Sequence, residues 1–260
     1  MKKNSLCGWI WVAAIALSAG GLAGYASDNP PAPGFDQAGS DPQAIVLADQ
    51  VMERLGGRHN WDQTHYLTWR FFGKRLHVWD KWTGNIRFEE GALVVLMNIN
   101  SYQGRAWQEG QEITRPDSLQ ALLKHAHEAW INDSYWLIMP YKLKDSGVTL
   151  KYKGKGTTQE GRKADILVLT FKGVGVTPQN KYEVWVDQQD HLVKQWAYYV
   201  NAADAEPKFT GPWANWQSFG HIWLADDHGK LKHTDIAVFD QLPASVFTDP
   251  APVDLMKLKK

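Results

Sequence analysis

The sequence predicts an antiparallel α+β protein with two principal helices and ten or eleven strands. After residue 60, most of the chain consists of short runs in which apolar and polar residues alternate, which is the period of a strand with one buried face. Two longer stretches, 41–55 and 115–133, carry apolar residues at helical spacing instead. The strand runs follow one another without helices between them, so the order lacks the strand–helix rhythm of a doubly wound fold.

The predicted elements begin at residue 41. Asp41 followed by Pro42 has the form of an N-cap with proline at the first helical position, and Gly56 and Gly57 end the stretch, which predicts an amphipathic first helix. Strand runs are predicted over 65–108, before the second helix. They resume after that helix over 148–239.

The first 26 residues have the features of a secretory signal peptide. Lys2 and Lys3 precede the uncharged stretch 8–23, which is too short to span a bilayer comfortably, and small residues occupy the −3 and −1 positions of a cleavage site after residue 26. This pattern predicts export to the periplasm or the medium. Cys7 precedes the apolar stretch, whereas a lipidated cysteine would follow it. A retained membrane anchor is the alternative.

Residues 27–40 are rich in Pro, Gly and small polar residues and predict a tether, after which 41–260 are expected to form a single domain. Cleavage removes Lys2, Lys3 and the single cysteine, so the 28 basic residues become 26 against 28 acidic ones. A net charge near −2 does not favour nucleic acid or an anionic membrane surface as the partner. Without cysteine, the mature domain depends on burial for its stability.

No motif in the chain predicts a catalytic or metal site. In the run at 125–128 the two histidines are two residues apart and face different sides of a helix, whereas helical zinc sites place them four apart. A Gly-x-Ser-x-Gly elbow is absent. The sequence therefore predicts no catalytic residues, no metal and no cofactor. An exported hydrolase or lyase with a composite site of His77, Asp80 and neighbouring groups is one alternative.

Tryptophan is the most informative residue type for function. Twelve of the fourteen tryptophans lie beyond residue 60, and their apolar area is too large for surface decoration. A large sheet tends to curl, and a curled sheet with an apolar inner face leaves a cavity unless helices fill it. The mid-chain helix is expected to act as a lid over this cavity. The expected ligand-binding residues are Leu67, Trp69, Phe71, Met97, Trp130, Trp136, Trp196 and Tyr198.

Four blocks of sequence carry a resemblance to a known fold: LADQVMERLGGRHNW, HYLTWRFFGKRLHVWD, WINDSYWLIMPYKLKDSGVTL and KYEVWVDQQDHLVKQW. They resemble an uncharacterised family of bacterial secreted proteins with the fold of the lipoprotein carriers LolA and LolB, over most of residues 45–250. The resemblance implies an incomplete antiparallel β-barrel, or half-barrel, with helices across its concave face and a cavity for acyl chains. In those carriers an arginine holds the helical lid shut, and the candidates here are Arg70 and Arg105.

Together these observations predict a periplasmic or envelope protein that holds a lipid acyl chain or another apolar ligand. The resemblance implies transient contact with envelope membranes or lipoproteins. A carbohydrate-binding module that stacks tryptophans on sugar rings is the second alternative. An acyl pocket would mix aromatic side chains with Leu, Met and Val, whereas a sugar platform would expose coplanar tryptophans beside Asp, Asn and Arg. The apolar face of the strand at 92–100 favours the acyl pocket.

Overall fold

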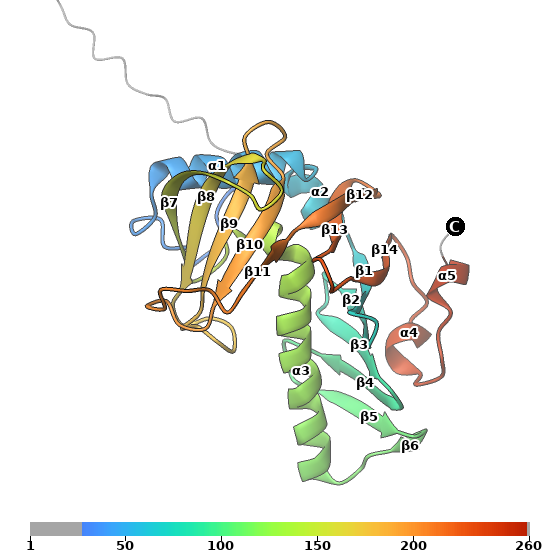
Figure 1. Ribbon diagram of the computed structural model, residues 1–260. Helices are drawn as coiled ribbons and strands as arrows, with labels where there is room; N and C mark the ends of the chain where they lie inside the picture. The colour runs from blue at the N-terminus through green and yellow to red at the C-terminus, as the bar shows by residue number, and fades with distance from the viewer. Residues whose placement is uncertain (1–27, 259–260) are drawn as a thin grey trace, which may run out of the picture.

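The computed structural model describes residues 28–258, so the predicted signal peptide at 1–26 lies outside the described residues. The described chain forms fourteen strands in three antiparallel sheets, together with one long helix and several shorter ones (Figure 1). The α+β class is confirmed, but the predicted count of ten or eleven strands is too low. Two of the missed strands, β6 (Gln111–Glu112) and β11 (Phe209–Pro212), are too short for an alternating pattern to reveal.

Seven strands form the largest sheet, in the order β14-β1-β2-β3-β4-β5-β6. The strands not yet given are β1 (Tyr66–Phe71), β2 (Arg75–Asp80), β3 (Asn85–Glu90), β4 (Leu93–Asn98), β5 (Gly104–Gln108) and β14 (Thr234–Phe239). Neighbours that follow one another in the chain form a meander of antiparallel pairs. β14 returns from the far end of the chain and pairs with β1, so the sheet joins the two ends of the domain.

Five strands form a second sheet, in the order β11-β10-β9-β8-β7, and a hairpin forms the third. The remaining strands are β7 (Val148–Thr157), β8 (Lys163–Phe171), β9 (Lys181–Asp187), β10 (Val193–Tyr199), β12 (Ala214–Phe219) and β13 (Ile222–Asp227). The strands expected to share one curled sheet are therefore divided between two open sheets. A long helix separates β6 from β7 in the chain, and strands β7 to β13 after it pair among themselves, whereas β14 returns to β1.

The two predicted helices are present as α1 (Pro42–Arg54) and α3 (Pro116–Ile138). α3 continues five residues past its predicted end and passes directly into the 3-10 turn η1 (Met139–Lys142). α1 contacts β7, while α3 runs along β4 and β5 and reaches the five-stranded sheet at its C-terminal end (Figure 1). Shorter helices are α2 (Gly57–Gln63), α4 (Ser245–Thr248) and α5 (Leu255–Leu258). Within residues 28–258, none of the helices has the length and hydropathy needed to cross a membrane.

One hydrophobic core joins the two larger sheets. It includes Leu47 of α1, Trp69 of β1, Leu137 of α3 and Trp196 of β10, all of them buried. A second core lies between α3 and strands β3 to β5 and is largely aliphatic. Because α3 contributes to both cores, this helix connects the two halves of the domain.

Residues 28–40, predicted as a tether, lie against the domain. The amide of Ala32 donates to the carbonyl oxygen of Lys144 at 2.9 Å, and the amide of Asp36 donates to the carbonyl oxygen of Val148 at 3.0 Å. Pro and Gly produce turns here, but backbone hydrogen bonds to β7 and to the loop between η1 and β7 fix the turns in place. The ordered fold therefore starts before residue 41.

Candidate functional site

The main candidate site is a pocket of about 390 Å³ between the C-terminal half of α3 and the five-stranded sheet. We call it the aromatic pocket. Seven aromatic side chains line it together with aliphatic and small polar residues, and these seven are Trp130, Tyr135, Trp136, Phe171, Tyr182, Trp196 and Tyr198. The rings contact one another: Trp136 meets Trp196 edge-on with ring centroids 4.5 Å apart, and Tyr182 stacks on Trp196 at 5.3 Å. Six of the seven rings therefore form one connected set, whereas the ring of Trp130 contacts Trp79 and His127.

The lining follows from local structure. Trp196 and Tyr198 are two residues apart on β10, so both point to the same face of the sheet. Tyr182 on β9 lies directly opposite Tyr198 in the strand register, which extends the aromatic surface to the next strand. The third wall is α3, where Ile131 and Tyr135 are four residues apart and lie on one side of the helix.

The structure divides the eight predicted ligand-binding residues into two groups. One group lines the aromatic pocket and consists of Trp130, Trp136, Trp196 and Tyr198. Their role in ligand binding stays a prediction, now located at this pocket. The other four do not reach the pocket. They are buried core residues of the seven-stranded sheet, namely Leu67, Trp69, Phe71 and Met97.

These four positions of the seven-stranded sheet are buried instead of open because α3 lies over the sheet. Met97 packs in the second core against the N-terminal half of this helix, which fills the concavity that the sequence predicts as open. Trp69 is fully buried and stacks on His77 with ring centroids 4.6 Å apart. Apolar alternation identified a buried face of β1 and of β4, but it does not reveal which inner face a helix covers.

Several polar atoms around the aromatic pocket make no hydrogen bond. They are the indole nitrogens of Trp130 and Trp196 and the hydroxyl of Tyr135, each buried from solvent. Burial raises the pKa of Tyr135 well above its ordinary value, so the hydroxyl keeps its proton and offers a donor. An unpaired buried polar group costs about 1–3 kcal/mol, which a ligand oxygen placed within reach would reduce.

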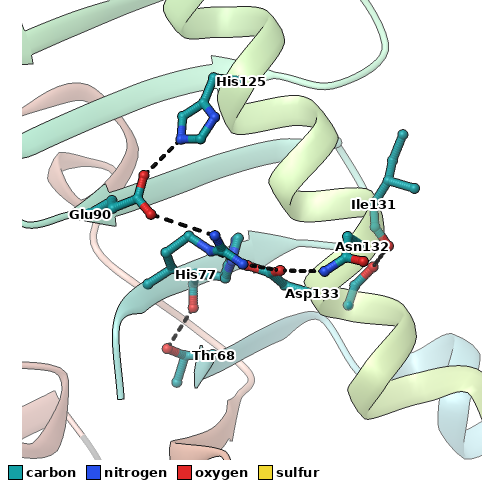
Figure 2. A network of polar contacts seen from close by, with 9 residues as sticks. Thr68, His77, Glu90, His125, Ile131, Asn132 and Asp133 are labelled. Carbon is teal, nitrogen blue, oxygen red and sulfur yellow. Dashed lines mark hydrogen bonds and ion pairs between the residues drawn. The ribbon is translucent and has the colours of Figure 1, made fainter. Parts of the chain in front are cut away.

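A charged network ties α3 to the seven-stranded sheet (Figure 2). Arg75 on β2 donates two hydrogen bonds of 2.7 Å to the carboxylate of Asp133 on α3, and the Nε2 atom of His77 lies 2.8 Å from the same carboxylate. Glu90 on β3 lies 3.5 Å from Arg75 and 2.7 Å from Nε2 of His125. Asp133 and His77 are fully buried, whereas Glu90 and His125 are partly exposed. The network thus runs from the interior to the surface.

The protonation states in this network favour structure over chemistry. Burial lowers the pKa of His77, so its imidazole is neutral and its Nε2–H donates to Asp133. Burial opposes ionisation of Asp133, but hydrogen bonds from His77 and Arg75 outweigh it and hold the pKa of the carboxyl below its ordinary value. The buried carboxylate is therefore a fixed anchor between α3 and β2.

The composite site of His77 and Asp80 does not form. Asp80 lies 3.1 Å from His65 and accepts hydrogen bonds from the amides of Trp82 and Thr83, so its carboxylate serves the β2–β3 turn. Three residues apart on a strand, His77 and Asp80 point to opposite faces. His77 is also fully buried, away from any substrate.

Arg75 contacts α3 through Asp133, although the candidates from the sequence were Arg70 and Arg105. Arg70 pairs with Asp235 and Arg105 pairs with Glu112, and these pairs are partly exposed. The signal available in the sequence was spacing, since Arg75 lies two residues before His77 and shares its strand face. The buried carboxylate partner, however, is contributed by a helix 58 residues away.

The two histidines of the run at 125–128 have separate partners. His125 binds Glu90, whereas Nδ1 of His127 lies 2.5 Å from the hydroxyl of Tyr102. This separation agrees with the prediction that they face different sides of a helix. Among the residues that the structure describes, no three His, Cys, Asp or Glu side chains are grouped closely enough to hold a metal ion.

Comparison with solved structures identifies similar folds. The chain is similar to LolA superfamily structures. The LolA superfamily protein from Nitrosomonas europaea is 12% identical, with a TM-score of 0.37 over 79% of this chain and 97% of that one. A putative outer membrane lipoprotein-sorting protein domain from Vibrio parahaemolyticus is 12% identical, with a TM-score of 0.41 over 84% and 99% of the two chains.

A protein of the DUF1329 family from Desulfovibrio piger is 13% identical, with a TM-score of 0.42 over 80% of this chain and 98% of that one. No family model matches the sequence. No curated protein matches it either. The similar structures include the superfamily that the sequence blocks resemble.

Proposed function

We propose that this protein binds the acyl chain of a lipid, or a similar apolar ligand, in the aromatic pocket. The observation that carries the proposal is the pocket itself: about 390 Å³, walled by connected aromatic rings and aliphatic side chains. This volume lies within the range of about 300–1,000 Å³ typical of small-molecule sites. The signal-peptide pattern supports a place in the periplasm or another envelope compartment, and the sequence resemblance supports a link to lipid or lipoprotein handling.

The energetics of such a site are adequate for a long chain. Each buried methylene contributes about 0.8 kcal/mol, so a chain of roughly a dozen carbons gains on the order of 10 kcal/mol before the costs of association. The rings of Trp136, Tyr182 and Trp196 already pack on one another, which reduces the side-chain entropy lost on binding. A shorter apolar ligand would bind correspondingly less tightly.

The alternatives have less support. A sugar platform needs several exposed tryptophans in one plane, but among residues 28–258 Trp82 alone is exposed, and its ring stacks on His65 at 3.8 Å. A hydrolase or lyase at His77 would require substrate to reach a fully buried imidazole. The aromatic pocket, in contrast, has room for a small apolar ligand.

The proposal is tested by asking what the protein carries and what it takes up. Native mass spectrometry of protein purified from its own envelope should detect a bound lipid, and palmitic acid added to the delipidated protein should shift its tryptophan emission. The Trp82→Phe variant serves as the control, because it removes the exposed tryptophan and should leave the shift in place. Absence of lipid, with emission unaffected by fatty acids and quenched by oligosaccharides, would contradict the acyl pocket.

A further inference from the structure

A second, more open hollow of about 570 Å³ adjoins the aromatic pocket. We call it the polar trough. Its polar side chains come from α3 and from the β4–β5 turn, and they are Tyr102, Gln120, Lys124, His127 and Glu128. Ile131, Gly175 and Val176 line both hollows. The two sites therefore share a wall, and a molecule long enough could occupy both.

The shared wall is apolar where the two hollows meet. Val176 belongs to the loop between β8 and β9, and 47% of its surface is exposed. Ile131 reaches the same place from α3. An exposed aliphatic side chain at the border between a ring-walled pocket and a polar hollow suits the point where an acyl chain joins its head group.

The polar trough carries one positive and one negative charge. Nζ of Lys124 lies 3.8 Å from a carboxylate oxygen of Glu128, which is too long for a hydrogen bond, and both side chains are well exposed. Their donors and acceptors are therefore available to a ligand. Burial lowers the pKa of His127, so this imidazole is neutral at pH 7 and can bind polar groups without adding a charge.

A second ion pair near the aromatic pocket, Lys142 with Asp145, is formed by direct contact of the two charged groups. Each of the two side chains is about two-thirds buried. Because each charge is satisfied by the other, this pair offers little to a ligand. The open Lys124–Glu128 pair is the better candidate for head-group recognition.

We propose that the polar trough binds a zwitterionic head group, its anionic centre on Lys124 and its ammonium on Glu128, while the acyl chain lies in the aromatic pocket. This inference rests on the proposed function. The ligand class is a zwitterionic amphiphile such as a phospholipid with a phosphate and an ammonium group. A purely anionic head group would gain Lys124 but would be repelled by Glu128 a few ångströms away.

The test compares head groups on one chain. Three palmitoyl probes, used below the concentrations at which they form micelles, separate the contributions: lysophosphatidylethanolamine, lysophosphatidylglycerol and palmitic acid. Tryptophan emission of the delipidated full chain reports binding. The zwitterionic probe should bind about three- to five-fold more tightly than the anionic lysolipid, the size expected of one partly exposed charge interaction.

Two variants locate the effect. Lys124→Gln should weaken binding of the zwitterionic probe by about three- to five-fold, and Glu128→Gln should abolish its preference over the anionic probe by strengthening binding of the latter. Lys155→Gln, which changes an exposed lysine on β7 outside both hollows, is the matched control and should change neither affinity. Thermal melting verifies that all three variants remain folded.

The outcomes separate the two proposals. If all three probes bind with similar affinity and neither trough variant alters it, the polar trough does not recognise the head group. The proposal that the aromatic pocket binds the acyl chain would still be supported. If none of the three probes binds, the proposed function itself is wrong. Tighter binding of the anionic than of the zwitterionic lysolipid would also overturn the zwitterionic assignment.

Discussion

The two halves of α3 lie against two sheets with opposite results. Its N-terminal half closes on the seven-stranded sheet, where Leu123 and Ala126 are buried in a filled, largely aliphatic core. Its C-terminal half faces the five-stranded sheet, where Trp130 and Tyr135 border a pocket. One helix therefore fills the space over one sheet and leaves a hollow over the other.

Side-chain size explains the difference. Small residues such as Ala126 and Ala129 let the helix approach the seven-stranded sheet closely, and Gly104 on β5 makes this approach possible. A Cβ atom at Gly104 would lie 2.8 Å from a methyl group of Leu123 on the helix, and nearer still to β4, at 2.5 Å from Cβ of Met97 and 2.6 Å from the carbonyl oxygen of Leu96. On the other half, rigid rings such as Tyr135 hold the five-stranded sheet away without filling the space between. Close packing and a binding pocket thus come from the same helix through different residues.

The largest expected effect comes from detaching α3 from the filled half. Asp133→Ala removes the carboxylate, which leaves the Nε2 atom of buried His77 without its partner and Arg75 with Glu90 alone, and this should lower the free energy of unfolding by about 3–5 kcal/mol. Urea denaturation measures it. Asp117→Ala, an exposed carboxylate in the first turn of the same helix, is the control and should cost only a few tenths of a kcal/mol. Equal losses in the two variants would show that the buried network does not hold the helix.

The filled and hollow halves should respond differently to truncation. Met97→Ala leaves a cavity in a packed core and should cost about 2–5 kcal/mol of stability without a direct effect on ligand binding. Tyr198→Ala enlarges an existing pocket, so it should cost less stability while weakening binding of palmitic acid. Denaturation and fluorescence titration on both variants measure the two effects. A large stability loss in Tyr198→Ala with unchanged affinity would mean that the hollow half is ordinary core.

Acid should destabilise the region beside the hollow half. His228 and His233 contact the ring of Trp136 or its neighbours, and burial lowers their pKa values to about 3 and about 4. In the unfolded chain these imidazoles take up protons near pH 6.5, so the unfolded state binds more protons between about pH 6.5 and pH 4. The free energy of unfolding should therefore decrease as the pH is lowered from about 6.5 to about 4, by up to about 1.4 kcal/mol per pH unit for each group.

Replacement of one imidazole tests this assignment. His228→Asn should reduce the slope of stability against pH between 6.5 and 4.5, whereas His59→Gln, which changes an exposed histidine, should preserve it. Denaturant midpoints at several pH values supply the measurement. An unchanged slope in His228→Asn would assign the acid sensitivity to other groups.

The smallest effect concerns the unpaired hydroxyl of the hollow half. Tyr135→Phe removes a buried hydroxyl that makes no hydrogen bond, so the free protein should become more stable by about 1 kcal/mol. If a ligand carbonyl or carboxylate uses this hydroxyl, the same variant should bind palmitic acid less tightly. Thermal melting and titration of the variant separate the two. A loss of stability would mean that the hydroxyl is satisfied in the native protein.

Local sequence pattern was sufficient for the longer elements of this fold. Helical spacing predicted α1 and α3, and alternation predicted the longer strands, because both periods follow from the direction in which successive side chains leave the backbone. β6 and β11 were missed, since strands of two and four residues carry too little pattern. The turns at 28–40 were recognised, but their hydrogen bonds to β7 and to the loop before it depend on partners more than a hundred residues away.

The sequence predicted the candidate site only in part, since four of the eight expected ligand-binding residues line the pocket. The composition of the chain determined that large aromatic surfaces must be buried, and strand alternation placed Trp196 and Tyr198 on one inner face. Only the tertiary structure decided that α3 covers Met97 and leaves a pocket beside Tyr198. Sheet membership and the approach of a helix depend on the fit of side chains distant in the sequence, which no local period encodes. For the same reason Arg75 and Asp133 became partners only once α3 lay across β2.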